Sequence, residues 1–421
     1  MRTVSKTVIG VDFGTQSARA VLVNAENGEI IYSCRKEYHY NSTPVPAIDC
    51  AENLPCATDY EMTLYELLRN VIPEEYRKTV AGICIDATSL TMVLLAEDGR
   101  ALSELDGWSE AAHARVKLWK YHRAQEKADE ALNLASNLQE PFLGRTGGSI
   151  SCEWMLPKLL EVRDEAPEIY SKIDLAMDLC EFLTFRLTGQ LVRSIGSLSY
   201  KCLWAEDLSF PERTFLNGLR AGFYEEYCHF LRGDVRKPGE CAGMLRSELT
   251  KRWGLPEQIP VATGMLDGHT SLATMGAFEP GDAALIVGTS NVCTVQDRKL
   301  QELKDVCGVA QDGMVTGSCG IDTGQSSTGN MLGWFVEHMA GWQIHREAEE
   351  RKISPHQVLA ERIQKPWENK VIAVDWWSGS RNAPCDLTLR GSMSGLEMDT
   401  KTQDIYLALL QAIACGTGTI L

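Results

Sequence analysis

The sequence predicts an α/β fold with two domains that face each other across a cleft. Short apolar, β-branched segments alternate with helical segments, as in α/β proteins. A strand, a turn of Gly, Thr and Ser residues and a second strand open the chain, and the same plan returns near residue 283. The 421 residues suffice for two or three domains at roughly 150 residues each. The repeated plan predicts a duplicated fold, with domains at 1–278 and 279–421.

The elements of the first domain are expected from hydrophobic periodicity and turn residues. β-Branched runs predict strands, Asn-Gly and Asp-Gly pairs predict turns, and apolar residues three or four apart predict helices. A cap at 58–59 is expected to start the first helix. The expected strands are 7–11, 18–23, 29–38, 80–86 and 91–95, and the expected helices are 60–71, 111–138, 154–163, 177–187 and 247–253.

The second domain is expected to open after a Glu-Pro-Gly-Asp stretch at 279–282. A strand at 283–287, a turn at 288–291 and a strand at 292–296 repeat the plan of the N-terminus. A Gly-rich polar stretch at 320–327 is expected to open a helix.

Composition and charge exclude several classes of partner. With 44% hydrophobic and 23% charged residues the chain is an ordinary globular protein. Its net charge of −16 argues against binding to nucleic acid or to an anionic membrane surface. The fourteen cysteines are scattered without zinc-site spacing, and the N-terminus does not read as a signal peptide. We therefore expect reduced thiols and a cytoplasmic location, with no nucleic-acid or membrane partner.

The turn at 12–17 has the residues of a phosphate-binding loop. Gly14 allows close approach of the backbone, and turn amides with the Thr15 and Ser17 hydroxyls can donate to phosphate oxygens. Asp12 at the strand end can hold Mg²⁺ directly or through water, and Arg19 adds a cation. The alternative is an ordinary hairpin with polar turn residues.

A second loop, Gly288-Thr289-Ser290, offers the same chemistry at the start of the second domain. Two such loops that face each other across a cleft can hold a nucleoside triphosphate from both sides. The chain contains no Gly-x-x-x-x-Gly-Lys-Ser/Thr sequence, so a P-loop kinase is excluded.

Asp267 follows an apolar strand and is flanked by Gly264 and Gly268. A carboxylate in that place can accept the proton of an alcohol and align it for attack on a phosphate. The alternative is a turn residue that caps a helix starting near Thr270. His269 is expected to be structural rather than a base.

Three further side chains are candidates for sugar or anion contacts, each with an ordinary structural alternative. Lys201 lies between aromatic residues, although an exposed surface is the more common place for a lysine. Trp119 is either a platform for a sugar or part of the core. Asp322 and Gln325 lie in the polar stretch whose amides favour anions at the start of a helix.

Taken together, these motifs resemble those of the FGGY carbohydrate kinases, and among them most those of the L-ribulokinases. The resemblance runs in order from residue 8 to about residue 418. Its motifs are Gly10 to Ser17, Lys117-Leu118-Trp119-Lys120, Ser151-Cys152-Glu153-Trp154 with Pro157-Lys158, Lys201-Cys202-Leu203-Trp204, Gly264 to His269, Gly288-Thr289-Ser290, Gly324-Gln325-Ser326, and Asp375-Trp376-Trp377 with Gly379 and Arg381.

The resemblance implies two ribonuclease-H-like domains, of the actin/hexokinase type, that close over MgATP and a ketopentose. It implies that ATP phosphorylates L-ribulose to L-ribulose 5-phosphate, with Asp267 as the catalytic base and Asp12 on the metal side. The implied sugar contacts are Ser89, Trp119, Lys201, Asp267 and Asp322, and the implied ATP contacts are Gly14, Thr15, Gln16, Ser17, Arg19, Gly288, Thr289, Ser290, Gly324, Gln325 and Ser327.

The sequence departs from the family pattern in three places. Asp322 stands where Glu is usual, and Ser89 stands where we expect Ala. Family members continue well past Gly416, so the second domain is expected to be incomplete at its C-terminus. The alternatives are a kinase for D-ribulose, xylulose or ribitol, a non-catalytic sugar-binding or regulatory relative, and an actin- or chaperone-like ATPase. A homodimer is the candidate assembly.

Overall fold

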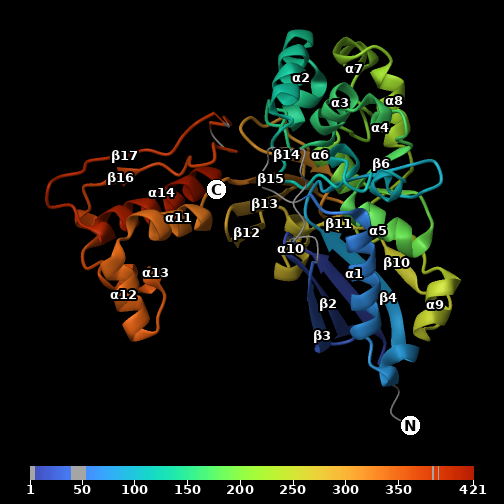
Figure 1. Cartoon of the computed structure of the whole chain (residues 1–421), viewed down its shortest axis with the longest axis horizontal. Coiled ribbons are helices and arrows are strands. Elements are labelled where there is room, and N and C mark those ends of the chain that lie inside the picture. The colour runs from blue at the N-terminus through green and yellow to red at the C-terminus, as the bar shows by residue number, and fades with distance from the viewer. Residues whose placement is uncertain (1–4, 39–53, 382–383, 387) are drawn as a thin grey trace.

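The computed structural model describes residues 5–38, 54–381, 384–386 and 388–421 and has a mixed α/β architecture (Figure 1). Its first half is built on a seven-stranded sheet in the order β3-β2-β1-β4-β10-β9, with β11 also paired to β4. The strands are β1 (Thr7–Phe13), β2 (Ser17–Asn24), β3 (Ile30–Glu37), β4 (Val80–Ala87), β9 (Cys241–Met244), β10 (Pro260–Ala262) and β11 (Met265–Leu266).

Buried and partly exposed residues alternate along β1, so one face of this strand packs in the core of the domain. The strands β1, β10 and β11 run parallel to β4, so their carboxyl ends meet at one edge of the sheet. The helices that contribute to its core are α1 (Ala57–Asn70), α5 (Leu179–Thr188) and α9 (Ser247–Trp253).

A helical lobe with its own apolar core lies above this sheet (Figure 1). Two short strand pairs join it to the sheet domain: β5 (Met92–Leu95) with β6 (Leu175–Asp178), and β7 (Val192–Ser194) with β8 (Asp234–Arg236). The lobe contains α2 (Gln125–Leu138), α3 (Met155–Glu165), α4 (Pro167–Tyr170), α6 (Ile195–Lys201), α7 (Arg213–Leu219) and α8 (Phe223–Phe230). The 3-10 turns of the first half are η2 (Glu74–Thr79), η3 (Leu102–Glu104), η4 (Ala112–Ala114) and η5 (Pro141–Arg145).

The second half repeats the opening hairpin in a four-stranded antiparallel sheet, ordered β12-β13-β15-β14. Its strands are β12 (Ala283–Val287), β13 (Asn291–Asp297), β14 (Gly308–Gln311) and β15 (Cys319–Gln325). The helix α10 (Asp267–Met275) precedes this sheet. The remaining elements are α11 (Gly329–Met339), α12 (Trp342–Arg351), α13 (Pro355–Glu361), η6 (Pro366–Glu368), β16 (Ile372–Ala373), β17 (Met393–Ser394) and α14 (Thr402–Ile420).

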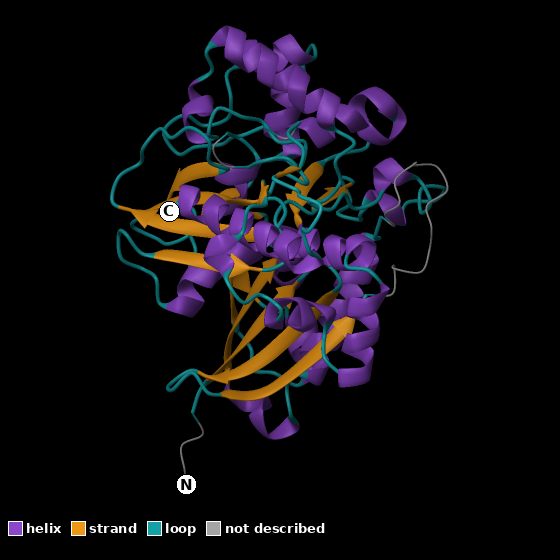
Figure 2. Ribbon diagram, turned by 90° about the vertical axis from the view of Figure 1, so that its left-hand side faces the viewer, coloured by secondary structure: helices purple, strands orange, loops and turns teal. Residues whose placement is uncertain are grey.

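The helices of the second half form a separate layer. The helices α11 to α14 share an apolar core of their own, and Figure 1 shows them well away from the first sheet. In Figure 2 this side of the molecule faces the viewer. Among the described residues, no helix combines the length and the apolar character that crossing a bilayer requires.

Tyr200 joins the two halves. Its hydroxyl donates to the carbonyl of Gly320 at 2.7 Å, and its side chain is buried. A Cβ atom at Gly308, Gly313 or Gly320 would meet the Tyr200 side chain at 2.7, 2.6 and 2.6 Å respectively. The absence of side chains at these glycines therefore lets α6 of the first half approach the second sheet.

Several predicted elements differ from the structure. Only 125–138 of the helix expected at 111–138 is an α-helix, because the amide and carbonyl of Lys117 pair with those of Met92 instead. Residues 175–178 form β6 before α5 begins, and α1 starts at Ala57, before the expected cap. The polar stretch around Asp322 lies in β15, paired with β13, rather than at a helix start.

Candidate active site

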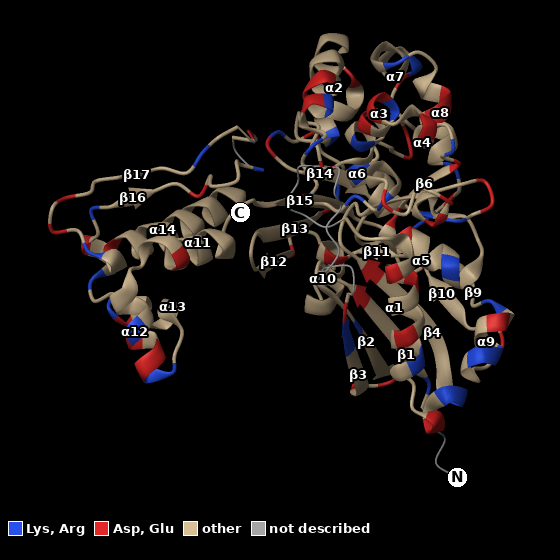
Figure 3. Ribbon diagram, in the orientation of Figure 1, with Lys and Arg blue, Asp and Glu red and all other residues tan. Residues whose placement is uncertain are grey.

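Three carboxylates meet at the carboxyl edge of the first sheet. In the parallel register Asp12 of β1 lies beside Asp86 of β4, and Met265 of β11 lies on the other side of Asp86. Asp267 begins α10 directly after β11. Figure 3 shows acidic positions gathered near β11 and α10. Parallel strands thus bring together side chains from three distant segments, at the edge where ligands bind in α/β sheets.

Asp267 is half-buried and is held by backbone amides. The amide of Gly268 donates to one carboxylate oxygen of Asp267 at 2.7 Å. Burial raises the pKa of Asp267 to about 6, and the Asp12 carboxylate adds to this rise. Backbone hydrogen bonds from Gly268 and Ser89 and the Lys201 ammonium lower the pKa. Asp267 is therefore mostly ionised at neutral pH, yet it is more basic than an exposed aspartate.

Asp86 is a member of this group that the sequence reasoning did not find. Burial raises its pKa to about 8, and the carboxylates of Asp12 and Asp267 add to the rise. One of its carboxylate oxygens is buried without a hydrogen-bond partner. Its place at the end of an apolar strand, as for Asp12, is the signal that points to it.

The group fits a divalent cation. Asp12 and Asp86 are neighbouring carboxylates, and one oxygen of Asp86 has no hydrogen-bond partner. A cation at this place would offset their mutual repulsion. Arg19 lies 3.2 Å from Asp12, but both side chains are partly exposed. Mg²⁺ binds one or two carboxylates and completes its shell with water and substrate phosphates, so Asp12 and Asp86 supply ligands of the kind that it accepts.

The predicted sugar-side residues Lys201 and Asp322 form an ion pair between the two halves. Their charged atoms are 3.1 Å apart, and His269 approaches Asp322 at 3.7 Å. Burial alone would raise the pKa of Asp322. The charges of Lys201 and His269 have the larger effect and hold this pKa well below its usual range. A buried carboxylate and a buried ammonium side by side can accept and donate hydrogen bonds to hydroxyl groups.

Trp119 links the sugar side to the first predicted phosphate loop. Its indole N–H donates to the Thr15 hydroxyl at 3.2 Å. The loop is closed by the amide of Gly14, which donates to the carbonyl of Ser17 at 3.1 Å. The Tyr38 hydroxyl donates to the carbonyl of Gly14 at 2.8 Å, and this contact supports the turn from behind.

The second predicted loop is exposed and held from behind by the start of α11. The amides of Thr328 and Gly329 donate to the carbonyls of Thr289 and Gly288 at 3.1 and 3.0 Å. Gly288 and Thr289 are exposed, and Ser290 is half-buried. These contacts leave the outer face of the loop accessible to a ligand.

The last three predicted ATP contacts support this loop from within. The Gln325 amide accepts from Asn291 at 2.8 Å and donates to Asp375 at 2.6 Å. Ser327 donates to the side chain of Asn330 at 3.1 Å. A Cβ atom at Gly324 would lie 2.3 Å from the Asn291 carbonyl. A direct contact of Gly324, Gln325 or Ser327 with a nucleotide stays a prediction.

An ion pair that the sequence reasoning did not assign to the site lies near Lys201. Arg381 of the second half donates to Glu153 of the helical lobe, and His122 approaches Glu153 at 3.0 Å. Burial alone would raise the pKa of Glu153. The charges of Arg381 and His122 have the larger effect, so the pKa is lowered to about 2. Both residues lie within motifs of the family resemblance, which is the signal that could have found them.

The described residues also enclose a cavity of about 360 Å³ beside α6, lined in part by Phe142, Arg145 and Trp204. None of the predicted sugar or ATP contacts lines this cavity.

Comparison with known proteins identifies the family. Residues 7–274 match the N-terminal domain of the FGGY family of carbohydrate kinases, and residues 283–421 match its C-terminal domain. The chain is 33% identical to a ribulokinase of Halalkalibacterium halodurans over 426 residues, and 36% identical to a ribulokinase of Mycolicibacterium smegmatis over 431 residues. Each match covers 99% of this chain and 76% of the relative, so the chain spans about three quarters of the length of these relatives.

Solved structures show the same fold. A xyloylose kinase from Brucella ovis superposes with a TM-score of 0.74 at 20% identity, over 99% of this chain and 78% of that chain. A gluconate kinase from Lactobacillus acidophilus superposes with a TM-score of 0.76 at 19% identity, over 98% and 77% of the two chains. These likenesses confirm the predicted two-domain sugar-kinase fold, and the family matches confirm the resemblance seen in the motifs. The chain belongs to the FGGY family of carbohydrate kinases.

Proposed function

We propose that the protein transfers the γ-phosphate of ATP to the terminal hydroxyl of L-ribulose and forms L-ribulose 5-phosphate. The observation that carries this proposal is the position of Asp267, which lies close enough to the Asp12 and Asp86 carboxylates and to the Lys201 ammonium of the Lys201–Asp322 ion pair for their charges to interact. The curated relatives named ribulokinase, which match nearly the whole chain, support the choice of sugar.

Asp267 acts as the general base in this reaction. It is mostly ionised at neutral pH because its pKa is about 6, so it can accept the proton of the attacking hydroxyl. The amides of Gly268 and Ser89 hold the carboxylate in place while the proton moves onto it. Because the transition state of phosphoryl transfer is loose, alignment of the hydroxyl contributes more than deprotonation.

Asp12 and Asp86 would hold Mg²⁺, which supplies positive charge to the transferring phosphate when it is bound. Loop amides and hydroxyls at Gly14 to Ser17 and at Gly288 to Ser290 would cradle the triphosphate from the two halves, with Arg19 adding a cation. In the first loop Gln16 is exposed and Ser17 is buried, and in the second loop Gly288 and Thr289 are exposed. Closure of the halves would exclude water from the transferring group.

Lys201, Asp322, Trp119 and Ser89 would bind the sugar. The ion pair supplies a donor and an acceptor for hydroxyl groups, and the indole ring supplies an apolar face. Asp322 is one methylene shorter than the glutamate of the family pattern, and it still reaches Lys201 at 3.1 Å.

The test is ADP release by the purified protein with MgATP and each of L-ribulose, D-ribulose, xylulose and ribitol. We expect the largest kcat/KM with L-ribulose, and a product whose phosphorus resonance is that of a primary phosphate ester. A larger kcat/KM with another sugar would overturn the choice of L-ribulose. Saturable sugar binding in calorimetry without any ADP release would instead identify a non-catalytic sugar-binding relative. A homodimer and a cytoplasmic location stay predictions.

A further inference from the structure

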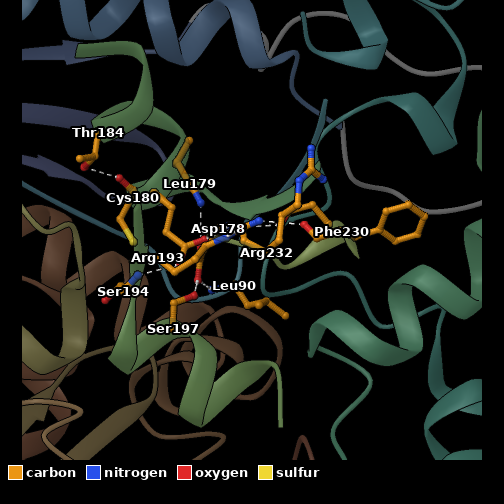
Figure 4. Close-up of polar contacts among 12 residues, drawn as sticks. Leu90, Asp178, Leu179, Cys180, Thr184, Arg193, Ser194, Ser197, Phe230 and Arg232 are labelled. Atoms are coloured by element: carbon orange, nitrogen blue, oxygen red, sulfur yellow. Dashed lines mark hydrogen bonds and ion pairs between the residues drawn. The ribbon is translucent and has the colours of Figure 1, made fainter. Parts of the chain in front are cut away.

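Asp178 is a buried carboxylate to which the proposed reaction gives no role. It ends β6 and caps α5, and its side chain is fully buried. Figure 4 shows it at the centre of a network of polar contacts. One of its oxygens accepts from the amides of Thr91 and Leu179 at 3.2 and 2.8 Å, and the other accepts from the amide of Leu90 and the hydroxyl of Ser197 at 3.1 and 2.8 Å.

Two of these donors belong to the turn at 88–91, which connects β4 to β5. Ser89 lies in this turn, and its backbone hydrogen-bonds to Asp267. Leu90 has a φ of 45°, in the left-handed region that a residue with a branched side chain rarely adopts. Backbone in such a conformation persists only where its surroundings hold it. The two hydrogen bonds to Asp178 are part of what holds it.

A third donor, Ser197, connects Asp178 to the helix that carries Lys201. Ser197 and Lys201 are four residues apart on α6, so they lie on the same face of the helix. Lys201 then reaches Asp322 of the second half at 3.1 Å. The hydrogen bond from Ser197 therefore connects α6 to the turn through Asp178.

Lys158 holds the same turn from its other side. Its buried ammonium donates to the carbonyl of Leu90 at 3.0 Å and to that of Leu118 at 2.9 Å. Trp119 follows Leu118 directly. Asp178 and Lys158 therefore link the backbone segments that carry Ser89, Trp119 and Lys201.

The charged groups around Asp178 are themselves paired. Glu181 completes the capping box by accepting from the amide of Asp178, and Arg193 pairs with Glu181 at 2.8 Å. Burial raises the pKa of Asp178 to about 7, and Glu181 adds to the rise. None of these groups is among the proposed sugar or ATP contacts, so Asp178 acts on the site only through what it positions.

We propose that Asp178 is a positioning residue for sugar binding: it fixes the turn at 88–91 against α6 and thereby sets the spacing between Ser89, Asp267 and Lys201. This inference rests on the proposed function, because it assigns sugar binding to those three residues. The inference also predicts that the KM for sugar changes more than the KM for ATP, since none of the groups that donate to the Asp178 carboxylate belongs to either predicted phosphate loop.

The test is steady-state kinetics of Asp178→Asn with the sugar and ATP varied separately. Asn keeps the size of the side chain but turns one accepting oxygen into a donor, so two of the four hydrogen bonds are lost. We expect the KM for sugar to rise about tenfold, which corresponds to about 1.4 kcal/mol of sugar affinity. We expect the KM for ATP to stay within about twofold of the wild type.

Two further variants keep the test decisive. Ser197→Ala removes only the link to α6 and is expected to raise the KM for sugar in the same direction by a smaller factor. Thr184→Val is the matched control, because Thr184 is buried on α5 and its hydroxyl donates only to the carbonyl of Cys180. It is expected to leave the KM for sugar unchanged. If Asp178→Asn does not fold, Ser197→Ala carries the test.

A folded Asp178→Asn protein with a wild-type KM for sugar would overturn the inference, as would equal rises in both KM values. A wild type without sugar-dependent ADP release would contradict the proposed function instead. Calorimetric sugar affinities of the same variants would then decide the positioning role, and a wild type that binds no sugar would overturn both.

Discussion

At the scale of single residues, the carboxylates at the sheet edge differ in proton affinity because their surroundings differ. Burial raises the pKa of Asp267 to about 6, but two backbone amides keep it from rising further. Asp86 has the Asp12 carboxylate as a hydrogen-bond partner, and its pKa rises to about 8. Without a bound cation, Asp267 is thus the more readily ionised of these two carboxylates at neutral pH, and it can accept a proton.

The pH dependence of turnover follows from Asp267. Its ionised form is the active one, so kcat/KM for sugar is expected to be level near pH 7 to 8. Below about pH 6 it should fall about tenfold for each pH unit, as the carboxylate becomes protonated. The measurement is kcat/KM between pH 5 and 8 at saturating ATP. A rate that stays level down to pH 5 would exclude Asp267 as the base with this pKa.

Individual residues could be predicted from the sequence where a strand ends in a distinctive motif. Asp12 and Asp267 each follow an apolar run and lie close to a glycine, and this pattern predicts both as site residues. Asp86 likewise ends an apolar strand, but no Gly-rich turn follows it, and the parallel pairing of β1 with β4 is what places it beside Asp12. The Lys201–Asp322 pair joins residues 121 positions apart, a contact that local patterns do not encode.

At the scale of elements, the second predicted phosphate loop depends on close backbone packing. A Cβ atom at Gly329 would meet the carbonyl of Gly288 at 2.5 Å, whereas a Cβ atom at Gly333 of the same helix would meet nothing within 4 Å. The loop therefore keeps its position because α11 begins with a residue that lacks a side chain.

Gly329→Ala is expected to displace this loop and to raise the KM for ATP about tenfold, since overpacking of a tight contact costs roughly 1–3 kcal/mol. The KM for sugar should change much less, because the sugar-side residues lie elsewhere. Gly333→Ala is the matched control and is expected to leave both KM values unchanged. Equal KM values for ATP in the two variants and the wild type would show that the loop does not contact the nucleotide.

Elements were predictable where the periodicity was strong and uninterrupted. The strands β1, β2, β12 and β13 and the helix α9 lie where the sequence predicts them, within a few residues. Residues 111–124 have helical spacing, but the backbone of Lys117 pairs with the edge strand β5, so tertiary pairing overrides the local preference. The Gly-rich stretch at 320–327 has the composition of a helix start, but its residues up to Gln325 form β15 and pair with β13.

At the scale of the whole molecule, the Glu153–Arg381 ion pair joins the helical lobe to the second half. The pKa of Glu153 is held at about 2 by Arg381 and His122, which is below the ordinary value of 4.5. Because the pKa is depressed in the folded state, the pair stabilises the fold above pH 4.5. This stabilisation is lost as the pH falls from 4.5 towards 2.

Glu153→Gln tests this contact between the halves. The variant is expected to lose at most about 3 kcal/mol of unfolding free energy at pH 7, and its stability should vary less than that of the wild type between pH 4.5 and 2. Urea unfolding at several pH values provides the measurement. Glu126→Gln, at an exposed position of α2, is the control. Identical pH dependence in the Glu153 variant and the wild type would show that the pair does not stabilise the fold.

The two-domain plan itself was predictable, because a strand, a turn of Gly, Thr and Ser residues and a second strand occur both at the N-terminus and near residue 283. The contacts between the halves were not, since Tyr200, Lys201 and Arg381 lie far in sequence from the groups that they meet. A mechanism that uses both halves depends on these contacts.

The central claim is that this FGGY kinase phosphorylates a pentulose with Asp267 as its base. Its most direct test is ADP release with MgATP and L-ribulose by the wild type and by Asp267→Asn, after both are shown to be folded. The account predicts sugar-dependent release by the wild type and a loss of about a hundredfold or more in kcat for the variant. Wild-type turnover by the folded Asp267→Asn protein would contradict it.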